Sequence, residues 1–251
     1  MFRVLILSVV MLLFVGQAYS KTLPVNEPVK PDKEVKETVL PTHKHSDACK
    51  NTQAEPVQII CILDRSGSMS KLAADTIGGY NSFIAQQKSK EGAAQVTTVL
   101  FDNEYEKITE AVDLQKVPEL TSAEYFARGS TALLDAVGRT LTETLANMER
   151  DKICPAKRRV LVLIMTDGYE NASKEFSKAQ VKALVEATTK QYDWNYLFIG
   201  ANIDAASEAG GIGIDSRHAA NYAPTGKGVR ESFDRMNAAA EEVRERGTLD
   251  K

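Results

Sequence analysis

Short apolar runs alternate along the chain with segments of helical periodicity, and this alternation constrains the fold more than any other feature of the sequence. The apolar runs occupy residues 57–63, 96–101, 160–165 and 196–199, and the helical segments occupy residues 134–148, 181–188 and 229–243. Continuous apolar runs of this length are typical of strands that are buried on both faces. Strands that alternate with helices predict a parallel sheet.

One strand is expected to run against the others. Residues 102–105 (Asp-Asn-Glu-Tyr) have the composition of a hairpin turn, which would join the second apolar run to an edge strand near residues 105–114. An antiparallel edge on an otherwise parallel sheet is common. The sequence therefore predicts an α/β fold that is doubly wound, with a mostly parallel central sheet, one antiparallel edge strand and helices on both faces.

Two capping boxes predict helix starts. Ser177 is followed three residues later by Gln180, and Thr121 is followed in the same way by Glu124. In a capping box the two residues exchange hydrogen bonds between side chain and backbone, which satisfies donors that the first helical turn leaves unpaired. A helix is expected to begin at each place.

The first twenty residues have the organisation of an export signal. Arg3 precedes an apolar run at residues 4–15, which is too short to span a membrane comfortably, and small residues at Ala18 and Ser20 precede an expected cleavage before Lys21. The alternative is an uncleaved membrane anchor. No other apolar run has spanning length, so the mature protein is expected to be extracytoplasmic, either periplasmic or secreted, without an integral membrane domain.

A flexible linker is predicted at residues 21–55, ahead of a folded domain at residues 56–251. The linker is rich in proline and charged residues and has no aromatic residue, so it cannot bury enough apolar surface to offset its ordering entropy. His43, His45 and Cys49 lie within it. A solvated polar tract is favoured there over a metal clip, because a flexible segment does not define a metal site.

Oxygen-bearing side chains occur where three loops of such a fold should meet. Asp64, Ser66 and Ser68 directly follow the first apolar run, Asp167 directly follows the third, and Thr131 precedes a helical segment. Ligands of open α/β sheets bind beyond the carboxyl ends of the strands, where the topology changes direction. These five side chains are therefore expected to converge.

The five side chains supply two carboxylates and three hydroxyls, without histidine or cysteine. Such hard oxygen donors suit one Mg²⁺ or Mn²⁺ ion with water in the remaining positions, and they do not suit Zn²⁺ or Cu²⁺. Neutral hydroxyls leave the ion with residual positive charge. An acidic group from a partner is expected to complete its coordination.

The series Asp64-x-Ser66-x-Ser68, Thr131 and Asp167-Gly168 resembles the metal-ion-dependent adhesion site (MIDAS) of von Willebrand factor A (VWA) domains. The resemblance covers roughly residues 56–246 and looks particularly like exported bacterial members. It implies that the hydroxyls contact the metal and that the aspartates do so directly or through water. It also implies a protein ligand, which often places a carboxylate on the metal, and hence a role in protein binding or adhesion.

The same resemblance suggests a disulfide. In that family the strands expected at residues 57–63 and 160–165 are parallel neighbours. Cys49 and Cys154 precede these two strands, so both would lie at the end of the sheet opposite the metal, where we expect a Cys49–Cys154 bond. Cys61 lies within an apolar run and is expected to be a small buried residue.

Other functions are less well supported by the residues. The formal net charge of −3 argues against nucleic-acid binding. A phosphohydrolase with Asp64 as nucleophile would need an acid–base carboxylate where Ser66 stands, and a serine hydrolase would depend on His218, the one histidine of the domain. No enzyme is expected. An alternative function is that of a scaffold that binds partners through another face of the fold, without metal.

Several polar residues near the candidate ligands have two possible roles. Asp102 and Glu104 would lie at the rim of the site or simply form the turn, and Arg128 would steer an acidic partner or be solvated. Glu170 and Asn171 are expected to support the metal ligands, and Asp135 is expected to be a carboxylate on the face of a helix.

Overall fold

The structure, a computed structural model, describes residues 55–249. The predicted signal peptide, all of the predicted linker except Glu55, and the residues His43, His45 and Cys49 lie outside the described residues, so the predictions about them stay predictions. Between residues 55 and 249, none of the helices combines the length and the apolar character needed to cross a membrane.

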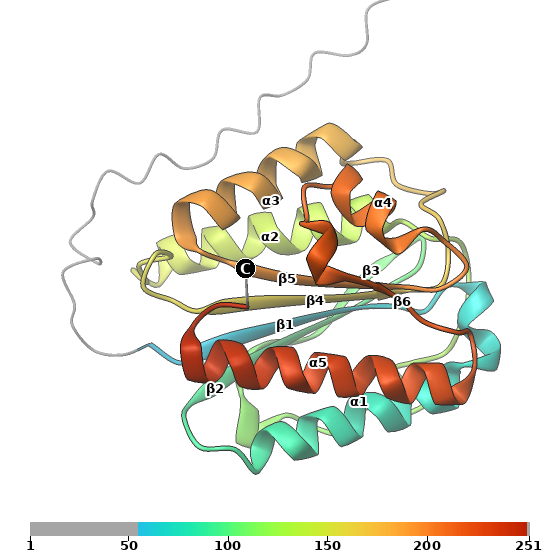
Figure 1. Cartoon of the computed structure of the whole chain (residues 1–251), viewed down its shortest axis with the longest axis horizontal. Helices are drawn as coiled ribbons and strands as arrows, with labels where there is room; N and C mark the ends of the chain where they lie inside the picture. Colours follow the sequence, from blue (N-terminus) through green and yellow to red (C-terminus); the bar gives the residue numbers. More distant parts are fainter. Residues whose placement is uncertain (1–54, 250–251) are drawn as a thin grey trace, which may run out of the picture. The chain divides into compact units, whose positions relative to one another are not determined.

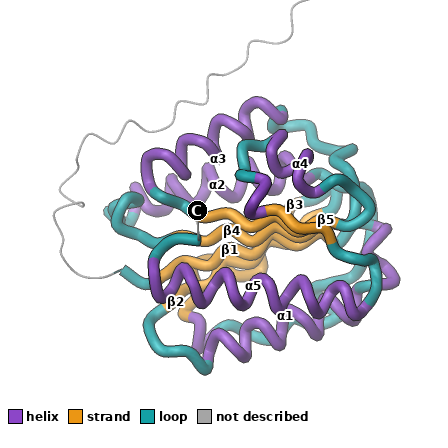
Figure 2. The backbone as a smooth tube through the Cα atoms, in the orientation of Figure 1, coloured by secondary structure: helices purple, strands orange, loops and turns teal. Residues whose placement is uncertain are grey.

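A six-stranded sheet forms the centre of the described domain, in the order β3-β2-β1-β4-β5-β6 (Figures 1 and 2). The strands are β1 (Val57–Asp64), β2 (Ala94–Phe101), β3 (Tyr105–Asp113), β4 (Val160–Thr166), β5 (Asn195–Gly200) and β6 (Ala219–Asn221). Neighbouring strands are parallel except for β2 and β3. The predicted fold class is confirmed, including the antiparallel edge strand.

The direction in which successive strands are added to the sheet reverses between β1 and β4, which are parallel neighbours. The chain proceeds from β1 to β2 on one side, whereas it proceeds from β4 to β5 on the other. Such a switch point is where open α/β sheets bind ligands. Asp64 is the last residue of β1, and Asp167 follows the last residue of β4, so the two predicted carboxylates leave the sheet side by side.

Helices cover both faces of the sheet (Figure 1). On one face lie α1 (Ala73–Lys88) and α5 (Gly226–Arg246), and on the other lie α2 (Leu133–Arg150), α3 (Lys178–Tyr192) and α4 (Ala205–Gly211). The side chains of β1 alternate between the two apolar cores, with Ile59 and Leu63 on the α1–α5 side and Ile60 and Ile62 on the other. Both faces of this strand are therefore buried, which explains its continuous apolar sequence.

Helix α1 was not predicted, because Gly78 and Gly79 interrupt its sequence and glycine disfavours a helix by roughly 1 kcal/mol. The structure gives a packing reason for Gly79. A Cβ atom on this residue would lie 2.2 Å from the ring of Phe233 in α5, so the absence of a side chain allows the two helices to pack closely. Helix α4 and strand β6 are short and were also not predicted.

Only one of the two capping boxes begins a helix. At α3, the Ser177 N–H donates to Gln180 Oε1 at 2.9 Å and the Gln180 N–H donates to Ser177 Oγ at 3.3 Å, as predicted. The Thr121 N–H likewise donates to Glu124 Oε2 at 3.0 Å, but an isolated turn follows instead of a helix. That helix prediction was wrong, because Tyr125 turns into the core and donates its hydroxyl to the backbone of Asp64.

Two of the cysteines lie within the described residues. Cys61 is buried and free, and burial raises the pKa of its thiol to about 12; its prediction as a small core residue is confirmed. Cys154 is buried and disulfide-bonded. Because Cys49 lies outside the described residues, the Cys49–Cys154 pairing stays a prediction.

Candidate metal centre

The first loop of the site leaves the end of β1. The Ser66 N–H donates to Asp64 Oδ1 at 2.6 Å, so the aspartate forms a tight turn with the residue that follows it by two. Ser66 then precedes the short 3₁₀ helix η2 (Gly67–Lys71). The hydroxyl oxygens of Ser66 and Ser68 lie 3.1 Å apart, so this turn places two of the predicted ligands beside each other.

Asp64 is held in place by neighbours on other elements. The Thr166 hydroxyl donates to Asp64 Oδ2 at 2.6 Å, and the Tyr125 hydroxyl donates to the Asp64 carbonyl at 2.5 Å. Thr166 ends β4, and Tyr125 lies on the loop before α2. Ser66 and Thr166 therefore orient the carboxylate, and Tyr125 holds the backbone that carries it. Neither Thr166 nor Tyr125 was predicted as a residue of the site.

Asp167 meets the first loop through Ser68. The Ser68 hydroxyl donates to Asp167 Oδ1 at 2.5 Å, and the Asn202 side-chain amide donates to the Asp167 carbonyl at 3.2 Å. The loop after β4 is thus joined to the loop after β1 and to the chain after β5. The carboxylate of Asp167 and the hydroxyls of Ser66 and Ser68 form one continuous group of oxygens.

Thr131 reaches the same group from the start of α2. Its N–H donates to Asn171 Oδ1 at 2.9 Å, and its carbonyl accepts from the Asn171 N–H at 3.0 Å. A Cβ atom built on Gly168 would lie 3.7 Å from Thr131 Oγ1 and 3.9 Å from Ser68 Oγ. Both hydroxyls therefore face Gly168, and the structure brings together all five predicted site residues.

Backbone hydrogen bonds tie the loops to one another. The Gly67 N–H donates to the Gly129 carbonyl at 3.1 Å, and the Arg128 N–H donates to the Arg65 carbonyl at 2.9 Å. Gly129 has a φ of +65°, a conformation that glycine adopts without strain. The relative positions of the loops, and hence of the oxygens they carry, are thus set by the backbone.

Neither carboxylate of the site forms an ion pair with a positively charged side chain among the described residues. Asp64 is completely buried and Asp167 is 4% exposed. Desolvation raises the pKa of Asp64 to about 6, and the negative charge of Asp167 adds to this rise, while hydrogen bonds from Thr166 and Ser66 oppose it. Burial also raises the pKa of Asp167. The nearby guanidinium groups of Arg65 and Arg128 pair with Asp102 instead.

A small divalent cation fits this group of oxygens. The 3.1 Å between the Ser66 and Ser68 hydroxyl oxygens is close to the separation of adjacent ligands in an octahedron with metal–oxygen distances of about 2.0–2.1 Å. An ion would also neutralise the two carboxylates, which otherwise repel each other. Both the spacing and the charge of the residues present thus suit a metal with hard oxygen ligands.

Without metal, the free energy of unfolding is expected to fall between about pH 4 and pH 6. Asp64 has a folded-state pKa of about 6 against an ordinary 3.8, so the folded state binds this proton more tightly and stability decreases as the proton leaves. The full difference between these two pKa values corresponds to a change of about 3 kcal/mol in the free energy of unfolding. Urea unfolding in EDTA at several pH values, for wild type and Asp64→Asn, measures it. Parallel pH profiles of the two proteins would contradict the expectation.

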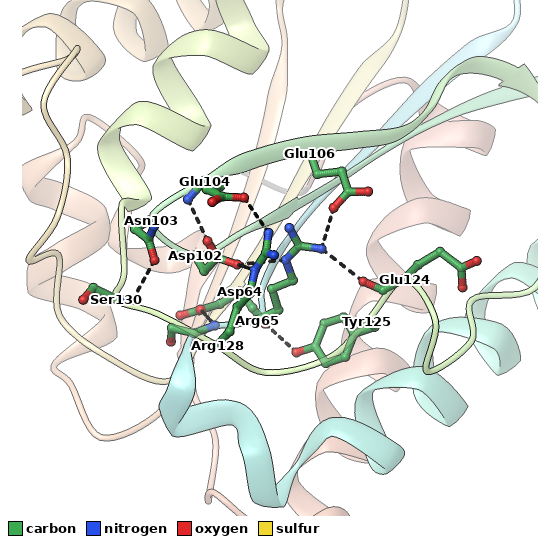
Figure 3. A network of polar contacts seen from close by, with 11 residues as sticks. Asp64, Arg65, Asp102, Asn103, Glu104, Glu106, Glu124, Tyr125, Arg128 and Ser130 are labelled. Carbon is green, nitrogen blue, oxygen red and sulfur yellow. Dashed lines mark hydrogen bonds and ion pairs between the residues drawn. The ribbon is translucent and has the colours of Figure 1, made fainter.

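A network of charged residues lies beside Asp64 (Figure 3). Arg65 and Asp102 are both completely buried, and Arg65 Nε lies 3.1 Å from Asp102 Oδ2. The same oxygen accepts from Arg128 Nε at 2.8 Å, and Arg128 also pairs with Glu104 at 2.7 Å. Arg128 is therefore held in two ion pairs, although its side chain is still 38% exposed, and Asp102 is a buried ion-pair residue as well as a turn residue.

Two further carboxylates order the loop after Asp167. Glu170 Oε2 accepts from the Leu134 N–H at 2.9 Å, near the start of α2. Asp135 accepts from the backbone N–H groups of Lys174, Glu175 and Phe176 at 2.7–2.9 Å. Glu170 supports the site as predicted. Asp135 lies on α2, as expected of a helix-face carboxylate, and its three backbone donors show that it also holds the loop, which was not predicted.

Sequence and structure comparisons place these features among known proteins. The sequence profile of the family described as "VWA domain containing CoxE-like protein" matches residues 42–198 of the chain. No protein matched in a search of the curated proteins. The profile match begins before the first described residue and ends within β5, so it includes the loops of Asp64, Thr131 and Asp167.

The chain is similar to several solved structures at low sequence identity, and the two given first, with TM-scores above 0.5, have the same fold. The vWF domain of the type V pili tip protein Mfa5 from Porphyromonas gingivalis matches with a TM-score of 0.52 and 13% identity, over 79% of this chain and 99% of that chain. Proximal thread matrix protein 1 from the mussel byssus, with a zinc-occupied MIDAS motif, matches with a TM-score of 0.51 and 13% identity, over 72% and 47%. A von Willebrand factor type A protein from Catenulispora acidiphila matches with a TM-score of 0.49 and 15% identity, over 74% and 43%. The chain thus matches less than half of the last two proteins.

Proposed function

The chain belongs to the VWA domain family, and from this premise we propose that it is an exported module that binds one divalent cation and uses it to bind another protein. The metal ligands in this proposal are Asp64, Ser66, Ser68, Thr131 and Asp167. A carboxylate of the partner completes the coordination of the ion. The proposal concerns binding and adhesion, and it includes no catalytic step.

The observation that carries the proposal is the convergence of the five oxygen-bearing side chains, with two buried carboxylates that no positively charged side chain among residues 55–249 neutralises. A site built for an internal ion pair would hold an arginine or lysine against these aspartates. Here Arg65, which stands between two of the ligands in sequence, is paired with Asp102 instead. An added cation is the simplest partner for the charge that remains.

Mg²⁺ and Mn²⁺ are the ions proposed, because all the donors are hard oxygens and three of them are neutral. The mussel byssus protein carries zinc in its MIDAS motif, so zinc is a necessary comparison in any binding experiment. The proposed location outside the cytoplasm rests on the sequence of residues 1–20, which has the organisation of an export signal.

The proposal is tested by selecting peptides from a displayed random library on the purified protein in Mg²⁺ and eluting them with EDTA. Peptides that elute with EDTA, contain Asp or Glu, and do not bind Asp64→Asn are the expected result. A carboxylate ligand should lose its binding when that residue is changed to the amide, which serves as the control on the peptide side.

Two outcomes would count against this function. If selected peptides bind equally in Mg²⁺ and in EDTA, partner recognition uses another face of the fold, as in a metal-independent scaffold. If EDTA releases peptides that lack any acidic residue, the ion supports the structure of the binding surface and does not contact the partner.

A further inference from the structure

Two large hydrophobic side chains are exposed in the part of the chain that the structure describes. They are Phe126, which is 44% exposed, and Tyr169, which is 55% exposed. Isolated exposed hydrophobic residues are ordinary on protein surfaces, but grouped ones mark interaction sites. Both of these residues lie on loops that carry proposed metal ligands, because Tyr169 follows Asp167 by two residues and Phe126 precedes Thr131 by five.

Tyr169 lies directly after the loop residues that surround the proposed metal. The residue before it, Gly168, lies near the hydroxyl oxygens of Thr131 and Ser68, since a Cβ atom built on it would lie within 4 Å of both. The Gly168 carbonyl accepts from the Thr166 hydroxyl at 3.2 Å. Glu170, the residue after it, is held by the start of α2 through its bond from the Leu134 N–H. The backbone on both sides of Tyr169 is thus fixed, and its ring is presented to solvent beside the ligands.

Phe126 is held by two arginines of the charged network. The guanidinium carbons of Arg65 and Arg128 lie 5.5 Å and 5.1 Å from the centre of its ring, within the range of cation–π attraction. The preceding residue, Tyr125, is buried and donates its hydroxyl to the Asp64 carbonyl. Phe126 is therefore attached closely to the Asp64 loop, although its ring stays half exposed.

We propose that Phe126 and Tyr169 form an apolar contact surface beside the metal and determine which partner it binds. This rests on the proposed function and adds the class of ligand: a protein segment with one carboxylate for the ion and large aliphatic or aromatic residues next to it. Burying such residues against exposed aromatic rings is a usual source of binding energy at interfaces.

The charges at the rim select against an acidic stretch. Glu104 and Glu106, whose side chains are 63% and 51% exposed, pair with Arg128 and Arg65. Because both arginines also pair with Asp102, the network holds three carboxylates against two guanidinium groups and is negative as a whole. Additional acidic residues in the partner would meet these negative charges, which costs free energy when like charges are brought together. The favoured ligand therefore has a single carboxylate within an apolar segment.

The inference is tested with the EDTA-eluted peptides from the selection described above. Their sequences should be enriched in large apolar residues within a few positions of a single Asp or Glu. For one such peptide, Phe126→Ser and Tyr169→Ser should each weaken binding at least about tenfold, while Phe126→Leu should weaken it less. Glu149→Ala, an exposed change at the far end of α2, serves as the matched control and should bind like wild type.

Each result distinguishes this inference from the proposed function. Metal stabilisation measured by thermal unfolding should be unchanged in the two Ser variants. Their weaker binding would then come from lost contacts with the partner and not from loss of the metal. If EDTA-sensitive peptides show no apolar enrichment and bind the Ser variants as wild type does, the aromatic surface is overturned while the metal-dependent function stands. If no EDTA-sensitive peptide is found, the proposed function itself fails. If Phe126→Ser abolishes the metal effect, Phe126 has a structural role and the inference is overturned for that residue.

Discussion

Mg²⁺ or Mn²⁺ added to the EDTA-treated protein is expected to raise its unfolding temperature by about 5–10 °C at neutral pH. Ligand binding to the folded state alone stabilises it by about 2.7 kcal/mol when the ion is present at 100 times its dissociation constant. For a domain of this size, 1 kcal/mol corresponds to a shift of about 2–4 °C. The effect is large here because the ion also removes the repulsion between Asp64 and Asp167, which lie together in a buried space.

Asp64→Asn is expected to abolish this rise. The amide oxygen can still accept from the Ser66 N–H, which bonds to Asp64 Oδ1 at 2.6 Å, so the turn should be preserved while the charge is lost. In EDTA the variant should be at least as stable as wild type at neutral pH, because it no longer buries an ionised carboxylate without a cation. A folded variant without a metal response therefore separates loss of the site from loss of the fold.

The matched control for this experiment is Asp234→Asn, an exposed residue of α5. It removes one negative charge from the surface and should keep the full response to Mg²⁺. Zn²⁺ and Ca²⁺ should be measured beside Mg²⁺ and Mn²⁺. An equal shift in wild type and Asp64→Asn would place the ion elsewhere, and no shift with any cation would contradict the proposed metal site.

The convergence of the ligands could be predicted from the sequence because it depends on the topology of the sheet. Asp64 and Asp167 end neighbouring parallel strands whose apolar sequences are continuous, so their common position follows once the strands are recognised. Helix α1 could not be predicted in the same way. Its Gly79 is unfavourable for a helix when considered locally, and only the contact with Phe233, 154 residues away in sequence, explains it.

The charged residues around the site were the least predictable. Nothing near Arg65 in the sequence indicates that it is completely buried, because its buried partner Asp102 lies 37 residues away. The Thr121 capping box forms locally but begins no helix, because burial of Tyr125 competes with helix continuation. Long-range pairing and tertiary packing decide these cases, and neither leaves a periodic pattern in the sequence.

Asp102→Ala is expected to lower the free energy of unfolding by about 3–5 kcal/mol, because it leaves the buried guanidinium of Arg65 without its buried carboxylate. Arg65 Nη2 already has no hydrogen-bond partner within the described part of the chain, and the pair that would remain, with Glu106, is half exposed, so the network has little capacity to compensate. Arg128 would lose the same carboxylate at 2.8 Å. Because the Arg128 N–H also donates to the Arg65 carbonyl at 2.9 Å, the loops that carry Ser66 and Thr131 should loosen as well, and metal affinity should fall. Urea unfolding in EDTA measures the first effect and Mg²⁺ titration the second.

Glu106→Ala is the matched control, because Glu106 pairs with the same arginine at 2.7 Å but its side chain is 51% exposed. Exposed ion pairs contribute about 0.2–1 kcal/mol, so this variant should be only slightly destabilised. The double variant Arg65→Met with Asp102→Ala should lose less stability than the two single changes together, because no unpaired buried charge remains in it. Equal effects of Asp102→Ala and Glu106→Ala would contradict the view that burial of the Arg65–Asp102 pair holds the metal-binding loops in place.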